Sequence, residues 1–111
     1  MVSKSPLAPK NFPNIPAVPG IQISAGACGV RYSQKTDLLL VVLSEETQVA
    51  GVFTKSKTAA APIDWCKKCL RSGNVRALVA NSGNANAFTG SPGVAAVERI
   101  ASRASQIIGC L

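Results

Sequence analysis

Apolar and polar positions divide the chain into segments of different period. Ile21 and Ile23 alternate with polar neighbours, as in a half-exposed β-strand. The segment Asp37–Leu43 (DLLLVVL) is continuously apolar after its first residue rather than alternating, which predicts a strand covered on both faces. A polar turn follows at residues 44–47, and a second apolar run covers Val49–Thr54. The two runs around the turn predict a β-hairpin.

Two further strands and a short helix are expected between residues 30 and 80. Val30–Tyr32 and Val75–Ala80 have the composition of short strands. Pro62 suits the first turn of a helix that extends to Leu70, and the following Ser72-Gly73 pair is a typical stop.

A longer helix is predicted near the end of the chain. Ser91 is the expected cap, Pro92 the first helical residue and Gly109 the C-terminal stop. Apolar side chains recur at helical spacing at Val94, Val97, Ile100, Ala101, Ala104, Ile107 and Ile108. Strands and helices together predict an α+β fold, a layered sheet with a helix packed on it.

Proline positions divide the chain into two parts. Five of the seven prolines lie at positions 6, 9, 13, 16 and 19. Each removes a backbone donor and restricts the preceding residue, so residues 1–19 are expected to form an extended arm. Residues 20–111 are expected to form the ordered domain, because 111 residues suit one domain rather than several.

Composition narrows the chemistry. The chain has no histidine, which excludes Ser-His-Asp and Cys-His nucleophile schemes and any metal site with a histidine ligand. Its net charge is +7, but the basic residues are spread along the chain and only five aromatic residues are present. We therefore expect no nucleic-acid binding, and the charge favours an acidic substrate or partner chain.

Cysteine usage and hydropathy predict a cytoplasmic protein. The four cysteines are few for a disulfide-stapled domain, and no apolar signal segment stands at the N-terminus. The longest aliphatic run, Leu38–Leu43, is far shorter than the roughly 18 residues of a membrane-spanning helix, so no membrane association is expected.

One candidate for chemistry is the pair Cys66 and Cys69, in the sequence Trp-Cys-Lys-Lys-Cys. This spacing resembles the thioredoxin-type redox motif, whose thiolate is stabilised at a helix N-terminus. A helix that starts at Pro62 would instead place both cysteines in its second turn, as small apolar residues on a buried face. A small thiol redox module that uses Cys66 and Cys69 is kept as the alternative function. No metal site is expected, because no second Cys-x-x-Cys completes a zinc site.

A second candidate is the loop Asn81–Gly90, which follows a predicted buried strand and precedes the long helix. Its amide side chains and glycines suit either a structural network of Asx turns or a ligand site at a strand-to-helix loop. The candidate residues that border a site are Asn81, Gly83, Asn84 and Asn86.

The same residues resemble the ornithine acetyltransferases, also called glutamate N-acetyltransferases, of arginine biosynthesis. The resemblance is carried by Val49–Thr54 (VAGVFT), Ala61-Pro62 and Arg76–Ala87 (RALVANSGNANA), with weaker support from Pro19–Ile21, Gly29–Tyr32 and Leu38–Leu43. It implies a layered α/β sandwich, of which this chain is the N-terminal segment.

The resemblance also implies an acyltransferase that moves acetyl from N-acetylornithine to glutamate through an acetyl-threonine intermediate. In that family a precursor cleaves itself before a threonine, whose own amine acts as base, so that no histidine is needed. No cofactor is implied, although some members also use acetyl-CoA as a co-substrate.

The family's catalytic groups are expected outside this chain. The nucleophilic threonine and the oxyanion Thr-Gly pair are expected beyond Leu111, so that no catalytic residue lies in the chain and the chain alone is predicted to be inactive. The implied partners are the remainder of the α chain and the β chain of the same precursor, assembled as a heterotetramer or higher αβ oligomer.

Overall fold

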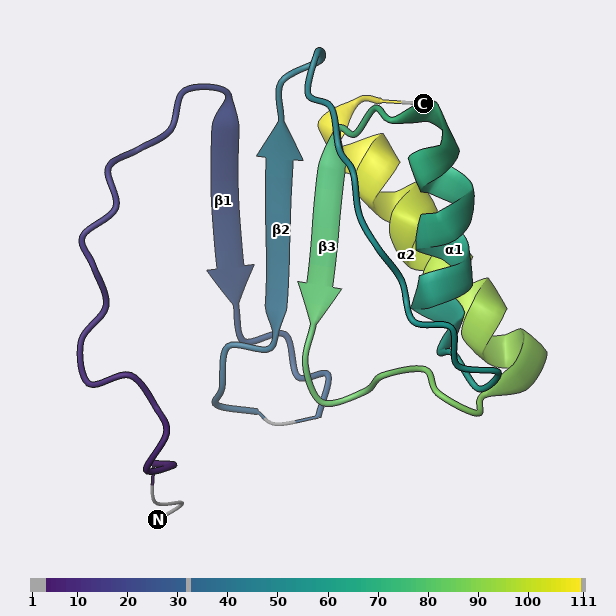
Figure 1. Ribbon diagram of the computed structural model, residues 1–111, viewed down its shortest axis with the longest axis horizontal. Helices are drawn as coiled ribbons and strands as arrows, with labels where there is room; N and C mark the ends of the chain where they lie inside the picture. The colour runs from purple at the N-terminus through teal and green to yellow at the C-terminus, as the bar shows by residue number, and fades with distance from the viewer. Residues whose placement is uncertain (1–3, 32, 111) are drawn as a thin grey trace.

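A three-stranded antiparallel sheet and two helices make up the computed structural model, which describes residues 4–31 and 33–110 (Figure 1). The elements in chain order are β1 (Ile21–Gly26), β2 (Leu38–Leu43), α1 (Ala61–Cys69), the 3-10 turn η1 (Leu70–Ser72), β3 (Ala77–Asn81) and α2 (Gly90–Ile108). The predicted α+β class is confirmed.

β2 is the central strand of the sheet, and its six residues are all half-buried. The expected cover on both faces is not found within residues 4–31 and 33–110. β2 pairs with β1 on one edge, with Ile21 opposite Leu43, and with β3 on the other, with Leu39 opposite Ala80. Directly opposed residues point to the same face of an antiparallel sheet. One face therefore carries only apolar side chains: Ile21, Ile23, Ala25, Leu39, Val41, Leu43, Leu78 and Ala80. We call it the open face.

The other face of the sheet is turned toward α2. Val79 and Ala77 on this face are half-buried, whereas Leu78 on the open face is 52% exposed. α2 contacts β3, and α1 packs on α2 beyond β3 (Figure 1). Neither helix therefore covers the open face.

Local sequence signals account for the helix ends. Pro62 lies in the first turn of α1, Asp64 in the same turn and Lys67 and Lys68 in the last turn, so that both charges complement the helix dipole. Gly73, in left-handed conformation, follows η1, and Gly109 ends α2 in the same conformation. Both predicted glycine stops are confirmed.

The predicted hairpin between Leu38–Leu43 and Val49–Thr54 is wrong. Both edges of β2 are already occupied by β1 and β3, so no edge is left for a third partner. Val49–Thr54 forms no strand; Gln48 makes an isolated bridge with Asn74, and the chain then continues toward α1 with Val52 98% exposed.

Three smaller expectations also need correction. Val30 and Arg31 lie in a bend rather than a strand, and Tyr32 is outside the described residues. The cap of α2 is Thr89 rather than Ser91, and its side chain makes no capping hydrogen bond. The predicted apolar stripe of α2 is not buried along its whole length, because Val94 is 49% exposed and Ile107 63% exposed.

Residues 4–20 run as an extended coil beyond the outer edge of the sheet, drawn in purple in Figure 1. Apolar side chains along it, such as Leu7 and Phe12, are exposed. Within residues 4–31 and 33–110, no apolar side chain is fully buried. None of the helices described is long and apolar enough to cross a membrane.

Candidate functional site

The loop Asn81–Gly90 is fastened by its own amide side chains. The Asn81 side-chain nitrogen donates to the carbonyl oxygen of Asn84 at 2.8 Å, and the backbone N–H of Asn86 donates to Oδ1 of Asn84 at 3.3 Å. Asn86 is half-buried, whereas Asn81, Gly83 and Asn84 are exposed. The structure therefore places Gly83, Asn84 and Asn86 in the connection between β3 and α2, and Asn81 at the end of β3.

Both non-glycine residues with positive φ among the described residues lie in this loop. Asn86 and Phe88 have positive φ angles of 47° and 56°, and Gly83 has a φ of 96°. Positive φ is unfavourable for residues with a side chain and persists only where neighbouring contacts enforce it. One such contact is a hydrogen bond in which the backbone N–H of Ala61, the first residue of α1, donates to the carbonyl of Asn86 at 3.2 Å.

The start of the loop lies against the connection between β1 and β2, at the lower end of the sheet in Figure 1. The N–H of Ser82 donates to the carbonyl of Asp37 at 2.9 Å. A Cβ on Gly83 would lie 2.7 Å from Cβ of Arg31, closer than real Cβ contacts come. Glycine is therefore required at this position both by φ and by space.

Asp37 is the residue that the sequence analysis did not single out. Its side chain is only 4% exposed, and its carboxylate accepts hydrogen bonds from the N–H of Cys28 at 2.7 Å and of Val30 at 2.6 Å. The Cys28 bond is the main cause that lowers the pKa of Asp37, against an opposing effect of desolvation. The available signal was an acidic residue directly before an apolar run.

The cysteine pair lies on α1, with Cys66 half-buried and Cys69 at the C-terminal end of the helix. Desolvation, and to a lesser extent the neighbouring Cys69, raises the pKa of Cys66. A redox thiol needs the opposite shift, because the thiolate is the reactive species. The redox alternative is therefore not favoured.

Nζ of Lys68 lies over the Trp65 ring, 5.9 Å from the centroid. No group of three or more potential metal ligands occurs among the histidine, cysteine and acidic side chains of the described residues.

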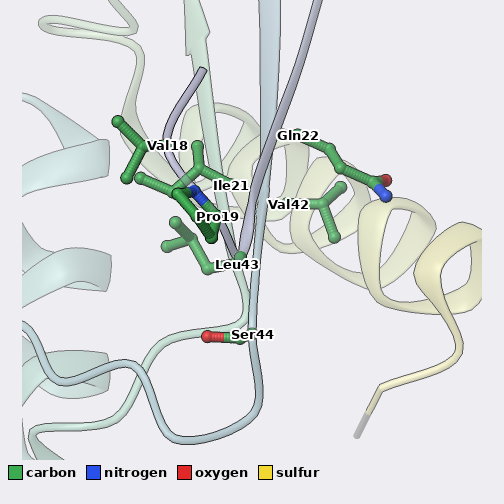
Figure 2. Close-up of a pocket in the computed structure, with 8 residues that line it drawn as sticks. Val18, Pro19, Ile21, Gln22, Val42, Leu43 and Ser44 are labelled. Atoms are coloured by element: carbon green, nitrogen blue, oxygen red, sulfur yellow. The ribbon is translucent and has the colours of Figure 1, made fainter. Parts of the chain in front are cut away.

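An open hollow of about 400 Å³ lies at the end of the sheet where β1 begins and β2 ends (Figure 2). Figure 2 shows Ile21 and Leu43 on one side of the sheet with Val18 and Pro19, and Gln22 and Val42 on the other. Its lining has no ionisable side chain. The strand direction places it at the opposite end of the sheet from the loop Asn81–Gly90.

Comparison with known proteins gives one consistent family. The model of the ArgJ family matches residues 22–111. The chain is 51% identical over 109 residues to the arginine biosynthesis bifunctional protein ArgJ of Agrobacterium fabrum and 49% identical over 108 residues to that of Bradyrhizobium diazoefficiens. These matches cover 98% and 97% of this chain but 26% of each relative, so the chain spans about a quarter of their length.

Two solved structures have the same fold over this region. The ornithine acetyltransferase of Mycobacterium tuberculosis, solved in complex with ornithine, matches with a TM-score of 0.65 and 40% identity over 69% of this chain and 40% of its own. The ArgJ protein of Bacillus halodurans matches with a TM-score of 0.77 and 26% identity over 84% of this chain and 49% of its own. Sequence and fold agree, and the chain belongs to the ArgJ family.

Proposed function

We propose that this chain is the N-terminal segment of an enzyme of arginine biosynthesis that transfers acetyl from N-acetylornithine to glutamate. The observation that carries the proposal is family membership over residues 22–111, together with 51% identity to a bifunctional ArgJ protein. The relative from Mycobacterium tuberculosis was solved with ornithine, the product expected of the first half-reaction.

The proposed reaction proceeds through an acetyl-threonine intermediate. The hydroxyl oxygen of an N-terminal threonine attacks the acetyl carbonyl of N-acetylornithine, and its proton passes through the threonine amine to the leaving ornithine amine. The glutamate amine then attacks the threonine ester, which releases N-acetylglutamate and restores the hydroxyl. The proposal places this threonine and its oxyanion donors beyond Leu111, with acetyl-CoA as an alternative acetyl donor.

The proposed partners are the remainder of the α chain and the β chain of a self-cleaving cytoplasmic precursor. Support comes from the open face, where Ile23 is 69% exposed and Leu78 52% exposed in the segment alone. A contiguous apolar sheet face of this kind is normally covered by another layer of the same protein. About three quarters of the relatives' length corresponds to sequence outside this chain, and it supplies the expected cover.

We further propose that the loop Asn81–Gly90 borders the acetyl-transfer site and positions its neighbours. Strand-to-helix loops often carry binding or catalytic residues, and a bulky residue at positive φ, here Phe88, is a feature that clusters at such sites. Replacement of Asn84 or Asn86 by alanine in the complete enzyme should lower turnover, and Asn11→Ala, in the exposed arm, is the matched control. Unchanged turnover in both loop variants would remove the loop from the site.

The main proposal is tested with a complete enzyme, this segment followed by the remaining residues of the Agrobacterium fabrum relative. Release of ornithine from N-acetylornithine is measured with and without glutamate, and the unmodified relative is the positive control. We expect the complete enzyme to release ornithine continuously with glutamate and at most one equivalent per site without it, and we expect no release by the isolated 111-residue chain. A folded but inactive enzyme beside an active relative would contradict the proposal, and transfer by the isolated chain would contradict the location of the catalytic groups.

A further inference from the structure

Asp37 is the one buried charged side chain among the described residues. Its two carboxylate oxygens accept separate hydrogen bonds, Oδ1 from the N–H of Cys28 at 2.7 Å and Oδ2 from the N–H of Val30 at 2.6 Å. Charge-assisted hydrogen bonds of this length are the strong ones, and a buried carboxylate needs them. The side chain therefore fixes the backbone of residues 27–31, the turn that follows β1.

The main chain of Asp37 extends these contacts to two more segments. Its N–H donates to the carbonyl of Gly26, the last residue of β1, at 3.0 Å. Its carbonyl accepts the N–H of Ser82, at the start of the loop Asn81–Gly90, at 2.9 Å. One residue thus joins the end of β1, the turn and the loop.

The turn held by Asp37 is also the surface on which the loop lies. Gly83 approaches Arg31 so closely that a Cβ would come within 2.7 Å of the Arg31 Cβ. A shift of residues 27–31 would therefore move Gly83 and, with it, the amides of Asn84 and Asn86. The middle of the loop is held separately, because the carbonyl of Asn86 accepts the N–H of Ala61.

We infer that Asp37 is a positioning residue for acetyl transfer, holding residues 27–31 as the support on which the loop Asn81–Gly90 is aligned beside the reacting groups. This inference rests on the proposed function of the complete enzyme. Asp37 does not touch substrate; it acts through the backbone of Cys28, Val30 and Ser82.

The test is Asp37→Asn in the complete enzyme described above. Asparagine has the same shape, but its NH₂ group faces an N–H donor and only one acceptor oxygen remains. We expect faster hydrogen exchange at the amides of Cys28, Val30 and Ser82, and a fall in kcat of about 10- to 100-fold, the size of effect that small misalignments cause. KM for N-acetylornithine should change little, because the loop aligns the site rather than binding the substrate.

Two controls separate positioning from loss of stability or charge. Val79→Ala, on the face of the sheet toward α2, gives a destabilised enzyme with Asp37 intact and should retain kcat per folded molecule. Glu46→Gln removes an exposed carboxylate at the turn after β2 and should leave kcat and the three amides unchanged.

The outcomes divide clearly. A fall in kcat with faster loop exchange supports the inference. Faster exchange with unchanged kcat overturns it, and so does a fall in kcat no larger than that of Val79→Ala at equal stability. The proposed function fails in a different way, by absence of acetyl transfer in the enzyme that carries the unchanged segment.

Discussion

Two independent constraints, a positive φ and a close neighbour, require glycine at position 83. Its φ is +96° and the Arg31 side chain fills the place of a Cβ, whereas Gly29 has a similar φ of +74° with nothing within 4 Å. Gly29→Ala should cost about 1–2 kcal/mol in the free energy of unfolding, from backbone strain alone.

Gly83→Ala should cost a further ~1–3 kcal/mol, because overpacking against Arg31 adds to the strain. Denaturant titration of the two variants in the complete enzyme measures the difference. Equal losses for the two glycines would mean that Arg31 is not held against the loop.

The carboxylate of Asp37 gives a prediction about acid. Hydrogen bonding by the Cys28 N–H lowers its pKa below the ordinary value of 3.8. The folded state therefore binds this proton less readily than the unfolded state, and the stabilising contribution is complete above pH 3.8. It is lost as the pH falls through the lower, folded-state pKa.

Denaturant titrations of wild type and Asp37→Asn at several pH values should give a constant difference in unfolding free energy near neutral pH. The difference should shrink below pH 3.8. A difference that does not depend on acid would show that the carboxylate is not charged when it holds residues 27–31.

The residues of the loop Asn81–Gly90 were predictable because their types are local signals. Asparagine and glycine tolerate left-handed backbone, and the loop indeed contains Asn86 and Gly83 at positive φ. Asp37 was not predictable as part of the same cluster, because its bond to Ser82 joins segments far apart in the sequence. The partner of a backbone carbonyl is decided by strand pairing, which no single residue type encodes.

The helix α1 governs the chemistry of its cysteines. Burial and the neighbouring Cys69 raise the pKa of Cys66, so the reactive thiolate is scarce near neutral pH. We expect Cys66 to be alkylated by iodoacetamide more slowly than Cys28, whose side chain is exposed, when both are followed by mass spectrometry at pH 7.5. Alkylation of Cys66 at the faster rate would restore the redox interpretation.

Helices and strands were predicted with different success. The bounds of α1 and the stop of α2 follow from Pro62, Gly73 and Gly109, which act within one turn of chain. The partner of β2 was mispredicted because a short polar turn between two apolar runs is typical of a hairpin. Both edges of β2 are instead paired, with β1 and with β3, and Val49–Thr54 forms no strand.

At the scale of the whole molecule, the helices cover part of one face of the sheet and leave the open face uncovered. If the remainder of the enzyme covers the open face, Ile23→Thr should destabilise the complete enzyme by about 1–3 kcal/mol through lost apolar burial, while keeping a β-branched side chain. Gln22→Thr, one residue earlier in β1, is the control and should stay within roughly 0.5 kcal/mol of wild type. Thermal unfolding that is the same for both variants would mean that Ile23 stays in water in the complete enzyme.

The open face matters during synthesis of a longer protein. If this segment is the N-terminal part of a polypeptide of the relatives' length, as proposed, it leaves the ribosome tens of seconds before the larger part does, at about 5–20 residues per second. During that interval Ile23 and Leu78 remain in contact with water, and no fully buried apolar side chain in the described residues anchors the segment. The nascent segment should therefore engage a chaperone before it engages its own later residues.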